Sequence, residues 1–522
     1  MAKKHTIGYN LLHDHKALSV VNNKVENVFC EKLDGYLDFP LNDSQKSVFI
    51  NSFNERLTLL WGPPGTGKTT VLSAITLGWI ERAQIEKKPC IIGVGSSNWT
   101  AIDNLLYDVK DLISNRIDVK GAFDLPVEVV RVQSPSGDDF HDDTINDVKV
   151  YSKDANEFKE KLDNPSCCII LAGTWKQLFN LTKSTKNSNA EIKKWIDLLL
   201  IDEASQVMVS QAAGYFLLLK EDANIVLAGD DKQLGPIIGF QMENTNDGLF
   251  DCVYTFMKEK HSVTPTPIIE NYRSNTYINT WPNERFYENK LVSKFENKSL
   301  DLRILSQKPE NWNGELIWND LFLEILDPSI PVVVLTYPGM TYTVSNPLEA
   351  QLASALVHLY KIHLPDETSN EDFVNKKIGI VTPHRAQKSN IFNLLSSAFG
   401  ETIESTIVDT VDRFQGQERD MIICSYSVAD KDFVISEDEF ILNPRRFNVS
   451  LTRAKSKFIM IISDSLLDYL PSDKKVAEDA SHIQLFVRKR CRFIKDVNFE
   501  FKDSGGEVKI MQCKMHVLNA VN

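Results

Sequence analysis

The chain has 522 residues, of which 43% are hydrophobic and 25% charged, and its formal net charge is −13. This composition is that of an ordinary folded protein, and the length predicts two to four domains of about 100–200 residues rather than one core. The acidic balance argues against wholesale binding to polyanions. Any site for nucleic acid would therefore be a local patch.

Neither a metal cluster nor a membrane segment is indicated. The eight cysteines include no C-x-x-C pair, which excludes the usual zinc-ribbon and iron–sulfur spacings and is typical of reduced thiols. The stretch MAKKHTIGYNLLHDHK lacks an apolar signal-peptide core, and no window approaches the ~20 apolar residues of a membrane span. We therefore expect a cytoplasmic protein, or a nuclear one in a eukaryote.

The first motif in chain order is LTLLWGPPGTGKTTVLSAI. Gly62, Gly67, Lys68 and Thr69 fit G-x-x-x-x-G-K-[ST], in which backbone N–H groups surround phosphates, the lysine reaches the β/γ oxygens and the threonine holds Mg²⁺. An apolar strand precedes the loop and a helical pattern follows it, so phosphate would face a helix N-terminus. A merely tight turn is the alternative interpretation.

The segment of about 107–166 contains the acidic loop SGDDFHDDT. Its aspartates and histidine are possible metal ligands, but charge clusters in loops are usually solvated. We expect this segment to be an insertion that ornaments the first domain.

The second motif is DLLLIDEASQ. Its apolar residues predict a strand buried on both faces, and Asp202 and Glu203 emerge at the C-terminal end of that strand. Adjacent carboxylates can divide two roles, with Asp202 holding Mg²⁺ through water and Glu203 polarising the attacking water. An acidic pair on a solvated loop is the alternative. The next strand, NIVLAGDDKQLGP, places Gln233 where it could sense a γ-phosphate.

A second α/β unit without a phosphate loop follows. Apolar strands in PVVVLTY, IVDTVDRFQGQERDMIICSYS and RRFNVSLTRAKSKFIMIIS surround the helical pattern EAQLASALVHLYKIHL. Such a unit, with arginines at its strand ends, is expected to close on the nucleotide of the first and to supply transition-state charge. The candidates are Arg273 and Arg453, and a surface salt bridge beside a strand is the alternative role for Arg453. A small-molecule kinase would need neither Arg453 nor Gln233.

The last 52 residues carry no motif. VNFEFKDSGGEVKIMQC alternates around a Gly-Gly turn and predicts a β-hairpin. The basic residues before it either extend a nucleic-acid track or solubilise a strand edge. They are Arg488, Lys489, Arg490 and Arg492.

The ordered motifs GPPGTGKT, DEASQ, GDDKQLGP, NYRSN, TPHRAQ, TVDRFQGQE and NVSLTRAK resemble those of superfamily 1B helicases of the nonsense-mediated-decay-factor type. Senataxin-like and immunoglobulin-µ-binding-type helicases belong to the same group. The resemblance runs from about 41 to 463. It implies an α/β fold of two tandem RecA-like P-loop NTPase domains of AAA type with parallel sheets. ATP would lie in the cleft between the domains, and single-stranded nucleic acid would lie across both.

The resemblance also predicts the domain boundaries. We expect an N-terminal extension at 1–40, a first RecA-like domain at 41–270, a second at 271–470 with an insertion at about 300–331, and a short α+β tail at 471–522.

Individual roles follow from the matched motif positions. The expected nucleotide-binding residues are Gln45, which would read adenine, Gly62, Pro63, Gly65, Thr66, Gly67, Lys68, Thr69, Thr70, Tyr272, which would stack on the base, and Glu418. The expected catalytic residues are Lys68, Glu203, Gln233 and the arginine fingers Arg273 and Arg453, and the expected metal ligands are Thr69 and Asp202.

Further strand-tip residues match positions that touch the nucleic-acid backbone in the family, so binding should tolerate most sequences. They are Ser97, Asn98, Thr100, Gly173, Thr174, Pro383, His384 and Thr410. Each is also compatible with an ordinary strand or helix cap. Trp99 and Trp175 either stack on bases or pack in the core, and packing is the favoured interpretation.

The sequence therefore predicts an ATP-dependent helicase or translocase on single-stranded RNA or DNA, using ATP and Mg²⁺ and moving 5′ to 3′ if the family polarity holds. Only some 40 residues precede Gln45, too few for the accessory β-barrel of several relatives. The alternative is thus a nucleic-acid-stimulated NTPase switch inside a larger defence or repair complex, without processive unwinding. RNA and DNA are not distinguished by any sequence signature.

Overall fold

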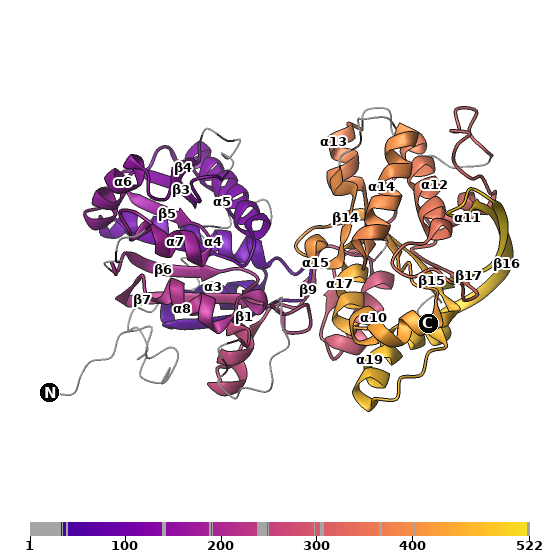
Figure 1. Cartoon of the computed structure of the whole chain (residues 1–522). Helices are drawn as coiled ribbons and strands as arrows, with labels where there is room; N and C mark the ends of the chain where they lie inside the picture. The colour runs from indigo at the N-terminus through magenta and orange to yellow at the C-terminus, as the bar shows by residue number, and fades with distance from the viewer. Residues whose placement is uncertain are drawn as a thin grey trace. The chain divides into compact units, whose positions relative to one another are not determined.

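A computed structural model of the chain describes residues 40–518, with 33 and 35–37, except for 138–141, 143, 187–188, 190–191, 237–247, 249, 297, 303–306, 365–367, 400–402 and 404. Most of the expected N-terminal extension and most of the acidic loop therefore lie outside the described residues. The chain divides into two compact units, Met1–Ile269 and Glu270–Asn522 (Figure 1).

The first unit is built on one eight-stranded sheet in which every pair is parallel, in the order β4-β3-β5-β2-β6-β7-β1-β8. In chain order the strands are β1 Leu57–Trp61, β2 Ile91–Gly95, β3 Val127–Gln133, β4 Asn146–Lys149, β5 Cys168–Ala172, β6 Ile196–Ile201, β7 Leu219–Gly229 and β8 Thr266–Pro267. Because parallel strands all end at one edge, the loops after them meet there.

Helices cover both faces of this sheet. The main helices are α3 Asp43–Asn54, α4 Lys68–Glu86, α5 Trp99–Lys120, α6 Lys153–Asp163, α7 Trp175–Leu181 and α8 Val209–Phe216. Alternate strand residues belong to separate cores, so that Leu199 packs with α6, α7 and α8 whereas Leu200 packs with α3, α4 and α5. The predicted strand buried on both faces is thus confirmed as β6.

The segment of 107–166 belongs to the body of this unit. It supplies the end of α5, the outer strands β3 and β4, and α6. Its hydrophobic residues, such as Val130 and Phe158, join the same core as the central strands.

The second unit contains a seven-stranded sheet in the order β13-β12-β14-β15-β11-β17-β16. The strands are β11 Val332–Tyr337, β12 Ile378–Thr382, β13 Val408–Thr410, β14 Arg419–Ser425, β15 Ala454–Ser463, β16 Cys491–Lys502 and β17 Val508–Leu518. The first five in the sheet are parallel, whereas β17 pairs antiparallel with both β11 and β16. The predicted C-terminal hairpin is therefore confirmed, and it extends the sheet of the second unit. A separate pair, β9 Glu270–Asn271 and β10 Val292–Ser293, precedes this sheet.

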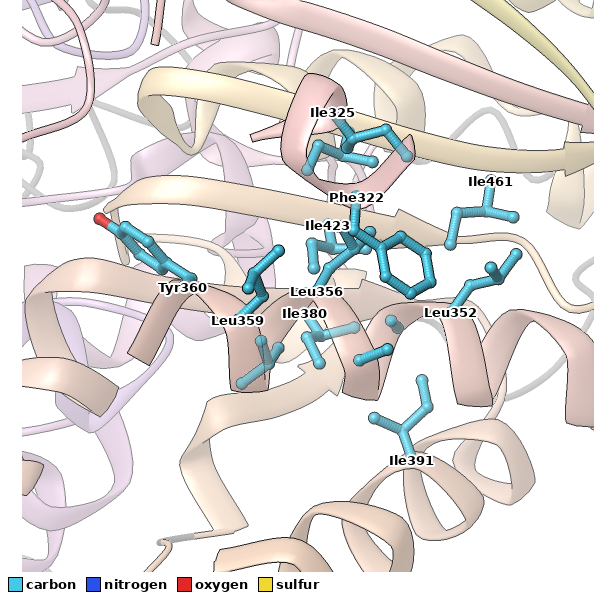
Figure 2. Packing of buried hydrophobic residues seen from close by; sticks show 14 of the residues in the cluster. Phe322, Ile325, Leu352, Leu356, Leu359, Tyr360, Ile380, Ile391, Ile423 and Ile461 are labelled. Atoms are coloured by element: carbon cyan, nitrogen blue, oxygen red, sulfur yellow. The ribbon is translucent and has the colours of Figure 1, made fainter. Parts of the chain in front are cut away.

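The helices of the second unit are α10 Thr276–Phe286, α11 Leu321–Ile325, α12 Pro347–His363, α13 Asn370–Asp372, α14 Arg385–Phe399, α15 Val411–Phe414, α16 Lys431–Ile441, α17 Pro444–Thr452, α18 Asp464–Leu467 and α19 Lys474–Leu485. Figure 2 shows Leu356 of α12 close to Ile380 and Ile423 of the central strands, and Leu352 on the Phe322 and Ile461 side of the same cluster. Phe322 of α11 lies in the same cluster, so the segment expected as an insertion contributes to this core.

Candidate functional site

The loop after β1 has the geometry of a phosphate cradle. Gly65 and Gly67 have φ values of 75° and 83°, which favour glycine, and Gly67 immediately precedes α4. A Cβ at Gly62 would lie 2.6 Å from Cγ of Lys68. The Lys68 Nζ donates a hydrogen bond of 2.8 Å to the carbonyl of Gly62, so the lysine lies back over the loop. Backbone N–H groups at the start of a helix favour an anion here.

The remaining loop residues line the same turn. Thr66 is buried, and its hydroxyl donates to the carbonyl of Pro63 at 2.8 Å. Thr69 is half-buried and Thr70 exposed in the first turn of α4. The four N–H groups that open a helix lack intrahelical partners, so this turn presents donors to a ligand.

Gln45 lies directly against this loop. It is the third residue of α3, where its side-chain Oε1 accepts from the backbone N–H of Asn42 at 3.1 Å and its backbone N–H donates to Oδ1 of Asn42 at 2.9 Å. Its Nε2 donates to the carbonyl of Thr66 at 3.1 Å. The glutamine thus caps a helix and braces the phosphate loop.

The acidic pair follows β6 and is buried. Asp202 and Glu203 are 5% and 8% exposed, which sets them apart from a solvated loop. Burial, together with the neighbouring Glu203 carboxylate, raises the pKa of Asp202. Its Oδ1 accepts from the N–H of Glu203 at 2.8 Å. Glu203 itself has φ 49° and ψ 41°, a left-handed conformation that is uncommon for a residue with a side chain.

Gln233 is held at the end of the neighbouring strand β7. Its Nε2 donates to Oδ2 of Asp230 at 2.8 Å, and both side chains are buried. Gly229 pairs with Trp61, and the N–H of Gly62 donates to the carbonyl of Gly229 at 3.1 Å. The strand tip carrying Gln233 is therefore adjacent to the phosphate loop.

The predicted nucleic-acid residues of the first unit lie at the same edge, after β2 and β5. Ser97 and Thr100 are exposed, whereas Asn98 caps α5 by accepting from the N–H of Ala101 at 2.9 Å. Gly173 is buried, and a Cβ there would lie 3.0 Å from the carbonyl of Val132. Thr174 is half-buried and precedes α7.

Tyr215 ties the two loops together. This buried side chain from α8 lies 3.1 Å from both the carbonyl of Ser96 and the carbonyl of Gly173. Burial raises the pKa of its hydroxyl well above the ordinary value, so the group stays a donor. It fixes the spacing between the tips of β2 and β5.

The two tryptophans of these loops pack against the protein. Trp99 is half-buried, packs on the α3–α5 side and lies beneath the guanidinium of Arg131, 4.2 Å from the ring centre. Trp175 packs on the opposite face against Gly214. The favoured interpretation of packing is confirmed for both.

The second unit brings four of its charged residues together. Nε of Arg273 lies 2.5 Å from Oε2 of Glu418, and Nζ of Lys455 lies 2.8 Å from Oε1 of the same carboxylate. These two cations, Arg273 above all, hold the pKa of Glu418 well below its ordinary value. Arg273 also donates to the carbonyl of Thr452 at 3.0 Å, which places it beside Arg453.

Arg453 is buried, 2% exposed, which sets it apart from a surface salt bridge. Its Nε donates to the carbonyl of Val449 at 3.2 Å, and its Nη1 donates to the carbonyl of Gln417 at 3.3 Å. Tyr272, 37% exposed, precedes Arg273 and donates its hydroxyl to Glu270 at 2.6 Å.

The other candidates of the second unit lie at the C-terminal ends of its parallel strands. This is the sheet edge opposite to the one that carries the charged cluster. Pro383 and His384 follow β12, and Thr410 ends β13. Nε2 of His384 lies 3.4 Å from Oε2 of Glu437, and its ring is near Phe433 and Phe440 of α16. Burial, then the charge of Arg446, lowers the pKa of His384, so its imidazole is neutral at pH 7.

Two of the basic residues before the C-terminal hairpin are paired with acids. Arg488 pairs with Asp468, and Arg490 pairs with Glu284. These pairs favour a structural role at the sheet edge over a free basic track. Within the part of the chain that the structure describes, no helix combines the length and apolarity of a membrane span, and no three metal-ligating side chains gather.

Several residues of the site were missed by the sequence analysis. Asp230, Gln206 and Lys455 sit inside recognised motifs, but each also has a partner that follows or precedes another strand. Tyr215 belongs to no motif, and its place beneath the loops depends on the packing of α8.

Comparison with known proteins supports the arrangement in both units. Two different family models, each described as an AAA domain, match residues 40–196 and 251–465. The DNA polymerase alpha-associated DNA helicase A of Saccharomyces cerevisiae is 26% identical over 484 residues, covering 83% of this chain and 66% of that protein. The ATP-dependent helicase NAM7 of the same yeast is 24% identical over 451 residues, covering 81% of this chain and 41% of that protein.

The chain spans 66% or less of the length of these two relatives. Among solved structures, the crystal structure of Arterivirus nonstructural protein 10 (helicase) covers 86% of this chain and 65% of its own, at 13% identity and a TM-score of 0.36. Two AAA-domain models match the chain in succession. The two yeast helicases are similar to it across both of these regions. In both regions the chain is similar to superfamily 1 helicases of the nonsense-mediated-decay-factor-like group.

Proposed function

We propose that the chain is an ATP-dependent helicase or translocase that acts on single-stranded RNA or DNA and moves 5′ to 3′. The observation that carries the proposal is the single sheet edge of the first unit. There a phosphate cradle, a buried acidic pair and exposed polar groups follow the adjacent parallel strands β5, β2, β6, β7 and β1. One rigid sheet can thereby hold the nucleotide and the strand side by side.

The residues around the phosphate loop fit a magnesium nucleotide. A Cβ at Gly67 would intrude to 2.7 Å from Nε2 of Gln45, so the cradle requires glycine. Thr69 offers a hydroxyl and Asp202 a carboxylate, the hard oxygen donors that Mg²⁺ prefers. When bound, Mg²⁺ neutralises phosphate charge. Lys68 would then exchange its bond to Gly62 for the terminal phosphates, while Glu203 orients and polarises water and Gln233 contacts the γ-phosphate.

The second unit would act on the same nucleotide in our proposal. Arg273 and Arg453 supply positive charge to the transferring phosphoryl group, and Tyr272 stacks on adenine, which Gln45 reads. Glu418 holds Arg273 in place through their ion pair. Alternate closing and opening of the two units would move the chain along the backbone.

Steady-state ATPase measurements with and without poly(U) or oligo(dT), beside unwinding of a tailed duplex, test this function. We expect hydrolysis to rise with either polymer and the tailed duplex to be separated. Stimulated hydrolysis without unwinding would instead support the nucleic-acid-responsive switch. Absence of any hydrolysis would overturn both.

The roles of the first unit are tested by Lys68→Ala and Glu203→Gln. Either change should lower turnover by about 10²–10⁴-fold, because each removes a group that acts on the reacting phosphate or water. Lys88→Ala and Glu86→Gln alter exposed residues at the far end of the same α4 region and serve as matched controls. Near-normal turnover in Lys68→Ala or Glu203→Gln would contradict the assignment.

The choice between RNA and DNA is tested by competition. Matched RNA and DNA oligonucleotides, offered together, should differ in their ability to stimulate the ATPase if a 2′-hydroxyl is read. Equal competition would mean that the backbone alone is recognised.

A further inference from the structure

The acidic pair continues into a single 3₁₀ turn, Ala204–Gln206, which begins directly after the left-handed residue Glu203. Such a conformation costs about 1–3 kcal/mol and persists only where the surroundings enforce it. The turn brings Gln206 back over Glu203, so that the Glu203 carboxylate lies on one side of the Gln206 side-chain amide.

Gln206 contacts two strand tips at once. Its Nε2 lies 3.5 Å from Oε2 of Glu203, at the long limit of a hydrogen bond. Its Oε1 accepts from the hydroxyl of Ser97 at 3.2 Å. Ser97 follows β2, which pairs directly with β6 through Gly95 and Ile201. An amide suits this place because it donates at one end and accepts at the other.

The two ends of this chain of contacts differ in exposure. Ser97 is exposed at the edge where we place the nucleic-acid backbone, whereas Glu203 is 8% exposed beside the phosphate loop. Gln206 is half-buried between them. The same turn also reaches the other side of the site, because Ser205 Oγ accepts from the N–H of Asp230 at 3.5 Å. The turn is thus the junction between the proposed strand contact and the proposed water-activating group.

We propose that Gln206 is a positioning residue that couples occupancy at Ser97 to the placement of the Glu203 carboxylate. A serine hydroxyl has one proton, which it donates either to Gln206 or to a phosphate oxygen. When the Ser97 hydroxyl donates its hydrogen bond to a nucleic-acid phosphate instead, the Gln206 amide loses its anchor and closes the long contact to Glu203. The inference rests on the proposed function and assigns the route by which the strand stimulates hydrolysis.

Substitutions at Gln206 and at Ser97 should change different ATPase rates. Gln206→Ala should lower the nucleic-acid-stimulated rate by about tenfold, because the carboxylate is no longer aligned, and should bring the ratio of stimulated to basal rate toward one. Ser97→Ala should also lower this ratio, but by raising the basal rate, because the amide is released without a strand. The double variant should match Gln206→Ala alone.

The basal ATPase rate, the stimulated rate and the oligonucleotide affinity, each measured on the full chain, separate the outcomes. Gln211→Ala is the matched control, since Gln211 caps the nearby α8 by accepting from the N–H of Met208 at 3.1 Å and should keep the wild-type ratio. Oligonucleotide affinity without ATP should change little in Gln206→Ala. A wild-type ratio in Gln206→Ala, or an unchanged basal rate in Ser97→Ala, overturns the inference. A wild-type protein that nucleic acid does not stimulate overturns the proposed function itself.

Discussion

Gly67 shows how one residue combines backbone and side-chain constraints. Its φ of 83° strains any other residue by about 1–2 kcal/mol, and an added Cβ would also lie 2.7 Å from Nε2 of Gln45. We expect Gly67→Ala to destabilise the protein and to abolish binding of a non-hydrolysable ATP analogue, because Gln45 must leave the loop it braces. Equilibrium binding of a fluorescent analogue checks this.

Gly121→Ala is the control for backbone strain. Gly121 ends α5 with a φ of 86°, and an added Cβ there would meet nothing within 4 Å. Because this φ occurs with a ψ of −179°, a combination that almost only glycine adopts, Gly121→Ala should lose at least as much stability and keep its affinity for the analogue. Equal loss of affinity in both variants would show that strain alone, and not the contact with Gln45, impairs the loop.

For single residues, the sequence predicted which residues belong to the site better than it predicted which side chains and carbonyls they contact. The spacing of Lys68, Thr69, Asp202 and Glu203 is local to the motifs, so their place at strand ends followed from the pattern. The bond from Gln45 to Thr66 joins residues that are 21 apart in the chain, and the burial of Arg453 results from packing in the second unit. Such contacts have no local signature.

Among the elements, Tyr215 of α8 links the tips of β2 and β5. Tyr215→Phe removes the donor shared by the carbonyls of Ser96 and Gly173, and a buried unpaired group costs about 1–3 kcal/mol. We expect a loss of stability of that order and weaker binding of single-stranded oligonucleotides, with ATP-analogue affinity unchanged. Urea unfolding and fluorescence anisotropy measure the two effects.

Tyr254→Phe provides the comparison. Tyr254 is equally buried in α9, Val253–Thr255, but its hydroxyl has no hydrogen-bond partner among the described residues. Removing it should be neutral or stabilising, since an unsatisfied group is lost. A comparable destabilisation in both variants would mean that ring packing, rather than the bond between the loops, is what matters.

A second link between elements depends on pH. Glu349, fully buried in the first turn of α12, accepts from Tyr337 of β11, from Ser425 of β14 and from the N–H of Ser427. Burial raises its pKa from 4.5 to about 7. Between these values the folded protein holds a proton that the unfolded chain has lost, so the contribution of Glu349 to stability falls as pH rises.

Glu349→Gln should remove this dependence. The difference in unfolding free energy between wild type and variant should fall by about 1.4 kcal/mol per pH unit from pH 4.5 to 7 and level off above. Other titrating groups cancel in the difference. A difference independent of pH, measured by urea unfolding of both proteins across that range, would show that Glu349 is ionised throughout.

The elements themselves were predictable where the pattern was local. The strand at 198–201 and the C-terminal hairpin were found from their periodicity. That the hairpin joins β11 could not be read from the sequence, because the pairing of β17 with β11 spans some 180 residues. The outer strands β3 and β4 were likewise missed, since they lie in a segment that contains no motif.

The whole molecule has its proposed catalytic groups in two separate units, with Lys68 and Glu203 in one and Arg273 and Arg453 in the other. If the second unit closes on a nucleotide held by the first, Arg453→Lys should lower turnover by about 10³-fold or more and leave ATP-analogue affinity nearly unchanged. The lysine keeps the positive charge but lacks the planar fork that contacts two phosphate oxygens. Turnover and analogue binding are measured on the same preparation.

Arg453 also donates hydrogen bonds to two backbone carbonyls, so Arg453→Lys can lower turnover by disturbing the fold. This effect must be distinguished from a direct loss of catalysis. Arg273→Ala supplies the independent test, since it removes the neighbouring guanidinium at a position that is less buried than Arg453. Arg490→Ala, which breaks a pair with Glu284 in the same unit, is the control for removing an arginine. Near-normal turnover in both Arg453→Lys and Arg273→Ala, with folding intact, would mean that the first unit hydrolyses ATP without the second.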